Sequence, residues 1–216
     1  TYCQLLKKES ELPSAIDAFL YNYHRQFGHL PSALFCDGAK VHLSSTVKAI
    51  LDKRLIKQFT TTPHGSEQNP AETYIGIICN KARTLLQAAG LGLEFWGYAV
   101  KEASYLHNRT PNKNNPQHMS PYEMEFGVKP DVSRIERFGS TVYVTLPHDG
   151  REHARDTSLD AAAAVGTLVG HAARAAGYIV YMPHTKRIWI RRHVRFHPPG
   201  SSPPTETDDD FRHRRR

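Results

Sequence analysis

The hydrophobic pattern of the chain changes its period once, near residue 138, and this change limits the folds that the chain can adopt. Before that point, short apolar runs alternate with segments whose apolar residues recur at helical spacing. The pattern predicts strand character at 1–6, 33–36 and 55–60, and helices at 9–27, 43–54, 72–89, 93–108 and 120–127. In the helix at 93–108, Phe95, Trp96 and Ala99 are among the residues predicted to point inward. Alternating strands and helices are typical of an α/β fold.

After residue 138 the apolar runs are short and β-like, and turn residues separate them. Strands are predicted at 141–146, 166–169, 178–182 and 187–190, with a hairpin turn at 184–186. Residues 148–164 are polar and then alanine-rich, which predicts a flexible link. We therefore divide the chain into an α/β domain at 1–138, a small β module at 139–197 and a disordered tail at 198–216.

The net charge and the spacing of the cysteines limit the partners and the cellular compartment that we expect for this chain. The chain has 28 Lys and Arg against 21 Asp and Glu, a net charge of +7, which favours a polyanionic partner and nucleic acid before membrane. No apolar run approaches the roughly 18 residues that a membrane span needs. The three cysteines are far apart in the sequence, so we expect neither a zinc ribbon nor a disulfide framework. We expect the protein to lie in a reducing compartment.

Two carboxylates are candidates for chemistry. Asp37 ends an apolar strand and Glu72 lies in the first turn of the helix at 72–89, and α/β folds place functional groups at such points. Brought together, such carboxylates could hold divalent metal ions, and two ions about 4 Å apart promote in-line phosphoryl transfer. A structural interpretation is also open, because the helix dipole favours Glu in a first turn and Asp-Gly is a common turn.

Basic residues near these carboxylates are candidates for nucleic-acid contact. Arg83 falls near the helix stripe that carries Glu72, where it could reach a phosphate, although a solvated arginine is the simpler interpretation. We predict that Lys40, Lys48 and Arg83 lie on one contact face. The arginine-rich end at 212–216 is either a nuclear-localisation or nucleic-acid signal or a solvated tail.

Short motifs follow one another along the chain in a characteristic order: LFCD at 34–37, TTTP at 60–63, AE at 71–72, RTLL at 83–86, AGL at 89–91, FW at 95–96, NRTP at 108–111, SPYE at 120–123, FGVKP at 126–130 and RFG at 137–139. In this order they resemble the integrase of copia-type LTR retrotransposons. GYIVY at 177–181 and RHVRF at 192–196 look like the small SH3-like β-barrel that follows the core in that family. The resemblance covers roughly residues 1–197.

The resemblance implies an RNase H-like integrase core, truncated at its N-terminal strands, and a small SH3-like β-barrel. It implies an Asp, Asp, Glu triad that binds Mg²⁺ or Mn²⁺. It also implies an enzyme that processes the 3′ ends of element cDNA and joins these ends to target DNA. Asp37 matches the second Asp and Glu72 matches the Glu, whereas the first Asp is expected upstream of Thr1. The implied partners are DNA and further copies of the full-length protein, with no membrane partner. The implied location is the nucleus, after cytoplasmic assembly.

Departures from the family pattern leave the activity open. Asp37 and Glu72 are one residue closer in sequence than in the family, and Thr73 and Gly76 stand where basic residues are expected. We expect a polynucleotidyl-transferase region that is inactive in this chain. The alternative is a non-catalytic relic that binds nucleic acid or protein. A different RNase H-like nuclease would not explain residues 120–139 or the β module.

Overall fold

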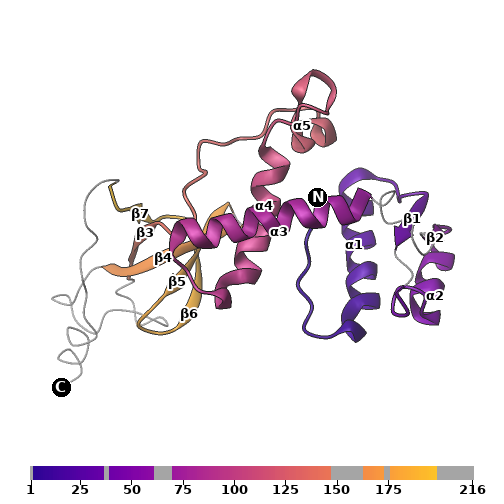
Figure 1. Cartoon of the computed structure of the whole chain (residues 1–216), viewed down its shortest axis with the longest axis horizontal. Helices are drawn as coiled ribbons and strands as arrows, with labels where there is room; N and C mark the ends of the chain where they lie inside the picture. The colour runs from indigo at the N-terminus through magenta and orange to yellow at the C-terminus, as the bar shows by residue number, and fades with distance from the viewer. Residues whose placement is uncertain (1, 37–38, 61–69, 147–162, 173–175, 199–216) are drawn as a thin grey trace. The chain divides into compact units, whose positions relative to one another are not determined.

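A computed structural model describes residues 2–36, 39–60, 70–146, 163–172 and 176–198 (Figure 1). The chain forms two compact units, one made of residues 2–77 and the other of the described residues from 78 onward. Each unit is described by itself. The domain boundaries predicted after residues 138 and 197 stay a prediction.

The first unit is a small α/β arrangement. Its elements are η1 (Glu9–Glu11), α1 (Leu12–Phe27), β1 (Ala33–Cys36), α2 (Ser45–Lys53), β2 (Lys57–Thr60) and the start of α3 (Pro70–Ala89). The strands β1 and β2 are parallel, with Ala33 opposite Lys57, and α2 lies between them in sequence as a crossover of parallel strands requires. The core of this unit consists of Leu20, Val47, Leu51 and Ile56.

Local chemistry sets the ends of the helices in this unit. Gly28 follows α1 with a φ of 75°, a left-handed conformation that glycine adopts without steric cost, and its N–H donates to the carbonyl of His24. Before α2, the side chain of Ser44 accepts a hydrogen bond from the N–H of Val47, which satisfies one free donor of the first turn.

One face of the β1–β2 pair is aromatic and open to solvent. Phe35 and Phe59 are partners in the strand register, and their rings stack with centroids 5.0 Å apart. Phe35 is 65% exposed, and among the described residues β1 and β2 pair only with each other. Parallel sheets are normally covered on both faces, so this exposure is unusual.

The second unit combines helices with an antiparallel sheet. Its helices are the rest of α3, η3 (Leu93–Phe95), α4 (Trp96–Arg109), η4 (Pro116–His118) and α5 (Pro121–Phe126). The sheet has the order β6-β5-β4-β3-β7, formed by β3 (Thr141–Thr145), β4 (Ala163–Ala172), β5 (Gly177–Met182), β6 (Arg187–Arg191) and β7 (Arg195–Phe196). Its core cluster consists of Val142, Val144, Ala164, Leu168, Tyr178, Val180, Met182 and Trp189.

The predicted class, α/β followed by a small β module, is confirmed, and most predicted elements are present. The prediction of strand character at 1–6 is wrong, because residues 2–6 are neither helix nor strand. An extended segment becomes a strand only where a neighbour offers ladder hydrogen bonds, and Tyr2 instead packs its ring against Phe19 at 5.2 Å. Ala163 and Ala164, predicted as part of the flexible link, belong to β4.

Other predictions for the link and the tail lie outside the described residues. This holds for 148–162 of the link and for 199–216 of the tail, including the arginine-rich end at 212–216. None of the described helices is both long and apolar enough to cross a membrane.

The core of the first unit generates a testable prediction. Leu51→Ala removes a buried side chain between Val47 and Ile56, and the cavity it leaves lowers the free energy of unfolding by about 2–5 kcal/mol. Leu55→Ala is the matched control, because Leu55 is 90% exposed and its loss changes stability by less than about 0.5 kcal/mol. Urea unfolding of both variants measures the difference, and equal losses would contradict this core.

Candidate functional site

The carboxylate Glu72 lies in the first turn of α3, where it is exposed and lines a cavity of about 250 Å³. Cys36, the last residue of β1, lines the same cavity. The carboxyl end of β1 and the start of α3 therefore meet at one cavity within the first unit. Asp37 follows Cys36 in sequence and lies outside the described residues.

The walls of this cavity are mostly apolar, with a small polar group at the end of β1. The side-chain amide of Gln58 donates to the carbonyl of His42 at 2.8 Å and to the sulfur of Cys36 at 3.4 Å. These bonds attach the turn before α2 to β2 and β2 to the end of β1. The cavity thus has a fixed polar edge beside Glu72.

The ligand set for a metal is incomplete in the described part of the chain. Within those residues, no three His, Cys, Asp or Glu side chains come close enough to hold a metal ion. Glu72 supplies one hard oxygen donor group, and Mg²⁺ is normally held by one or two carboxylates together with other oxygen ligands. The described residues do not form a metal centre by themselves.

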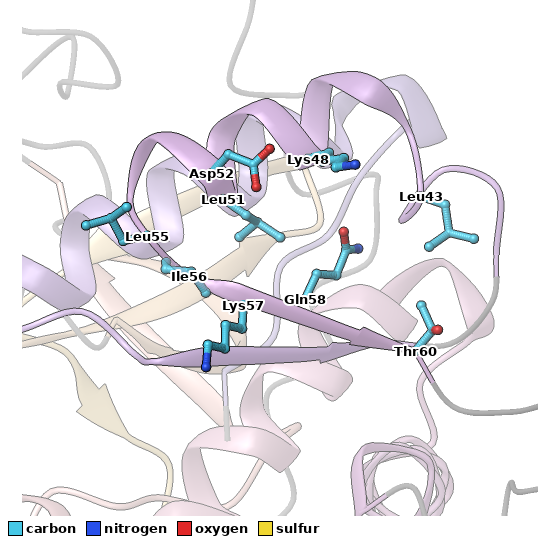
Figure 2. A pocket seen from close by; sticks show the side chains of 9 residues that line it. All are labelled: Leu43, Lys48, Leu51, Asp52, Leu55, Ile56, Lys57, Gln58 and Thr60. Carbon is cyan, nitrogen blue, oxygen red and sulfur yellow. The ribbon is translucent and has the colours of Figure 1, made fainter.

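The basic residues predicted to contact nucleic acid lie in both units. Lys40 and Lys48 are exposed in the first unit, in the turn before α2 and on α2. Lys48 lines a groove of about 810 Å³ between α2 and β2, where Figure 2 shows it with Lys57 on the strand. Arg83 is exposed on the part of α3 in the second unit and donates to Oδ1 of Asn80 at 2.8 Å. Their common contact face stays a prediction.

A stronger concentration of positive charge was not among the predicted sites. Residues 186–195, called here the basic segment, hold one lysine and four arginines and no acidic residue. Arg187 on β6, Arg195 on β7 and Arg192 between these strands are exposed. The guanidinium carbon of Arg191 lies 4.6 Å from the ring centroid of Trp189. The signal in the sequence is the density of basic residues without acidic ones.

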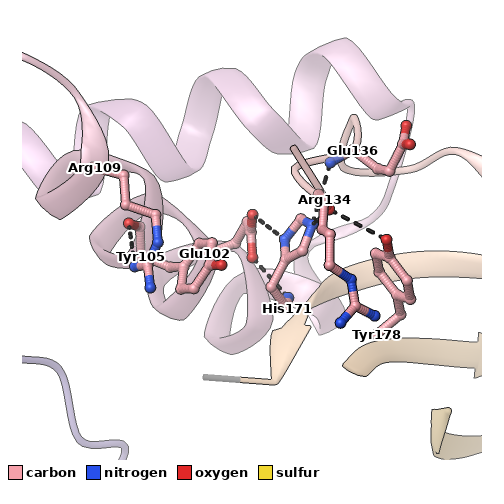
Figure 3. A network of polar contacts seen from close by, with 7 residues as sticks. All are labelled: Glu102, Tyr105, Arg109, Arg134, Glu136, His171 and Tyr178. Carbon is pink, nitrogen blue, oxygen red and sulfur yellow. Dashed lines mark hydrogen bonds and ion pairs between the residues drawn. The ribbon is translucent and has the colours of Figure 1, made fainter. Parts of the chain in front are cut away.

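A buried carboxylate–imidazole pair joins a helix to the sheet in the second unit (Figure 3). Glu102 on α4 is 2% exposed, and its Oε1 lies 2.7 Å from Nδ1 of His171 on β4. Its other oxygen accepts the backbone N–H of His171 at 2.9 Å. Nε2 of His171 lies 3.2 Å from both the N–H of Glu136 and the carbonyl of Arg134. Both ring nitrogens and both carboxylate oxygens are therefore engaged, as burial of charged groups requires.

A glycine forms a bulge beside this pair. The register between β4 and β5 shifts between Leu168 and Gly170, and Gly170 has a φ of 151°. Residues with a side chain rarely adopt this conformation, so a substitution would strain the backbone, although a β-carbon would lie in ordinary contact, 3.4 Å from Oε2 of Glu102. The resulting bulge bends the strand and directs His171 toward α4.

A second polar pair links α3 and α4. Nζ of Lys81 lies 3.1 Å from Nδ1 of His107. Burial, followed by the nearby charge of Lys81, lowers the pKa of His107, and burial also lowers the pKa of Lys81. The neutral imidazole accepts from the lysine, whereas a protonated one would place two positive charges together.

Comparison with known families supports the β module. Residues 140–210 match the family model described as the retroviral polymerase SH3-like domain. The match begins beside β3 and includes every strand of the antiparallel sheet. The predicted SH3-like module is therefore confirmed.

Several curated relatives are retrotransposon polyproteins. The Retrovirus-related Pol polyprotein from transposon RE2 of Arabidopsis thaliana is 27% identical over 197 residues, which is 91% of this chain and 13% of the relative. That from transposon RE1 of the same plant is 31% identical over 142 residues, 65% of this chain and 9% of the relative. That from transposon TNT 1-94 of Nicotiana tabacum is 25% identical over 193 residues, 89% of this chain and 14% of the relative. The chain thus spans only a small part of each.

A solved structure also resembles the chain. It is the simian T-cell lymphotropic virus intasome in complex with PP2A regulatory subunit B56 gamma, with 14% identity and a TM-score of 0.43, covering 91% of this chain and 67% of that one. A TM-score of this size does not establish a common fold. The polyprotein relatives and the SH3-like match support the predicted resemblance to an integrase region.

The buried Glu102–His171 pair generates a prediction. Glu102→Ala leaves His171 and its backbone N–H without their buried acceptor, and we expect it to lower the free energy of unfolding by about 3–5 kcal/mol. Glu125→Ala, at an exposed position on α5, changes it by less than about 0.5 kcal/mol. Chemical denaturation compares the two, and a loss under about 1 kcal/mol for Glu102→Ala would show that the pair is dispensable.

The Lys81–His107 pair generates a pH dependence. Because folding lowers the pKa of His107 below its ordinary value of 6.5, the unfolded chain binds the proton first as the pH falls. This contribution to stability is complete above pH 6.5 and is lost as the pH drops from 6.5 toward the folded-state pKa.

Denaturation between about pH 7.5 and about pH 5 measures this effect. His107→Gln removes the titrating group and flattens the decline in stability. His24→Gln, on the exposed side of α1, leaves the decline unchanged. A decline of equal slope in the wild type and in His107→Gln would assign the pH dependence to other groups.

Proposed function

We propose that this chain, which is related to the integrase region of retrotransposon Pol polyproteins, binds DNA through its SH3-like module. The observation that carries the proposal is the basic segment, which lies on the module that matches the retroviral polymerase SH3-like domain. Its exposed arginines offer planar donor groups that suit phosphate. The net charge of +7 adds a general attraction for a polyanion.

The proposed contact is with the DNA backbone rather than with base edges. The exposed arginines lie on β6 and β7, the two end strands of the sheet, and in the short segment between them. Backbone contacts fix register without reading sequence. Lys40, Lys48 and Arg83 form a second proposed set of contacts. DNA ends of the element and target DNA are the proposed ligands, with further copies of the full-length protein as partners in the nucleus.

We infer that the chain alone does not perform strand transfer. Asp37 and Glu72 are proposed as two of three catalytic carboxylates, and the first Asp would come from a longer chain. The cavity shared by Cys36 and Glu72 supports this pairing, because it brings the end of β1 to the start of α3. When bound, Mg²⁺ or Mn²⁺ would stabilise charge on the attacking and leaving oxygens.

A second candidate function is binding without chemistry. Thr73 and Gly76 on α3 favour it, because they remove positive charge beside Glu72. Sequencing the coding DNA upstream of Thr1 separates the two functions. A continuous frame with an Asp-bearing strand favours a working parent integrase, whereas a stop codon there leaves binding as the function.

DNA binding through the basic segment has a measurable salt dependence. Replacing Arg187, Arg192 and Arg195 with Gln should flatten the slope of log K against log salt by up to about 3, since each phosphate contact contributes about 0.9. Fluorescence anisotropy of a labelled duplex over a salt series gives this slope. A slope unchanged in the triple variant would contradict the proposal.

Two further triple variants complete the experiment. Lys7, Lys8 and Lys113 are exposed, and their replacement with Gln removes the same charge away from the proposed contacts, which should leave the slope nearly unchanged. Charge reversal at Lys40, Lys48 and Arg83 tests the second set of contacts. That set is excluded if both affinity and slope remain those of the wild type.

A further inference from the structure

A cavity of about 190 Å³ in the second unit combines two arginines with a set of aromatic side chains. It lies beside the buried Glu102–His171 pair, and the catalytic carboxylates proposed above do not line it. The side chains that carry the argument come from α4, α5, the segment that follows α5, and β5, and they are Tyr105, Arg109, Tyr122, Asp131, Arg134 and Tyr178.

The guanidinium of Arg109 is held in a fixed orientation. Its central carbon lies 3.6 Å from the ring centroid of Tyr105 and 5.1 Å from that of Tyr122. Nη1 donates to the carbonyl of Tyr105 at 3.2 Å, which engages one of the five donors of the group. His171 stacks against Tyr105 at 5.1 Å and fixes that ring. Arg109 therefore brings an oriented positive charge to the cavity wall.

Arg134 supplies the second positive charge on a fixed piece of backbone. Its carbonyl accepts from the hydroxyl of Tyr178 at 3.3 Å and lies 3.2 Å from Nε2 of His171 (Figure 3). Its side chain is exposed, lies 5.4 Å from the ring centroid of Tyr178, and donates through Nη2 to the carbonyl of Arg192 at 3.3 Å. The backbone of Arg134 is therefore fixed, whereas its side chain is accessible to solvent.

The charge and size of the cavity limit its ligand. Asp131 opposes the arginines, and hydrogen bonds from Ser133 lower the pKa of Asp131 and so keep it ionised. Arg109 and Arg134 outnumber this acid, so the lining is positive and favours an anion. The volume is smaller than the roughly 300–1,000 Å³ of typical ligand pockets, so a small anionic group fits better than a whole nucleotide. Paired guanidinium groups favour phosphate in particular.

We propose that this cavity binds one phosphate group of a nucleic acid, with Arg109 and Arg134 as the donors. The inference rests on the proposed DNA-binding function and adds a discrete site to it. Within the cavity, Arg109 sets the orientation of the phosphate, and Arg134 contacts the phosphate from the exposed side. A phosphate carried by a peptide is the competing ligand, and the experiment tests it directly.

The test follows the arginine side chains of the whole chain by NMR. Inorganic phosphate and a 5′-phosphorylated dinucleotide are titrated while the Nε–H signals of Arg109 and Arg134 are recorded. Saturable shifts of both signals, with tighter binding of the dinucleotide, support the proposal. Shifts that do not saturate, or a preference for a phosphoserine peptide, overturn it.

A matched pair of variants tests the role of Arg134. Arg134→Gln should weaken dinucleotide binding at least about tenfold, the loss of one charge-assisted contact. Arg137→Gln should bind as the wild type does, because Arg137 is also exposed and also donates to a backbone carbonyl, that of Ala88 at 2.8 Å, but does not line the cavity. Equal weakening in both variants overturns the proposal, and thermal unfolding confirms that each variant is folded.

This design separates the cavity from the wider DNA-binding function. In the variant with Gln at Lys7, Lys8 and Lys113, the dinucleotide should still bind with the wild-type affinity, and weaker binding there would overturn the cavity proposal. If duplex DNA fails to bind the wild type while the dinucleotide saturates the cavity, the proposed function fails and the cavity stands. If duplex DNA binds but the arginine signals do not respond to either phosphate ligand, the cavity proposal fails alone.

Discussion

The arrangement of the second unit depends on a carboxylate that has no access to water. Glu102 is buried against β4, and the bonds to Nδ1 and the backbone N–H of His171 replace its hydration. Because these bonds join a helix to a strand 69 residues away in sequence, they fix where α4 lies on the sheet. The same imidazole holds the backbone of Arg134 on its other side and the ring of Tyr105 on its face. One buried carboxylate–imidazole pair therefore positions the aromatic and cationic groups around it.

The local sequence pattern was sufficient to predict many of the helices and strands. It failed where contacts between distant segments determine which side chains are buried. The strand at 33–36 and the helix that ends at Ala89 follow from apolar spacing and from Gly90. In α4, Trp96 was predicted inward and is 56% exposed, whereas Glu102 is buried. An apolar stripe alone does not reveal a buried acid, because the partner of that acid lies on a distant strand. The bulge at Gly170 was equally hidden, since it makes three successive residues of β4 buried and breaks the alternation that a strand prediction uses.

The candidate catalytic site was accessible to sequence reasoning only through the order of its motifs. Spacing alone favoured a structural interpretation of Asp37 and Glu72 over a chemical one. The structure adds that the end of β1 and Glu72 line one cavity, a relation that 34 intervening residues do not reveal. The basic segment could have been found from composition, because it has no acidic residue among five basic ones. Arg109 and Arg134 could not have been found from composition, because each is an isolated arginine in the sequence and only the fold places both at one cavity.

The stacked Phe35–Phe59 pair has a consequence for the behaviour of the molecule in solution. It covers one face of a two-stranded sheet, and each of the two strands presents an edge without a described partner. An aromatic face beside open strand edges is a template on which other chains can add by strand pairing. Self-association should therefore start at β1 and β2. A charged side chain in place of either phenylalanine would act as a gatekeeper against aggregation.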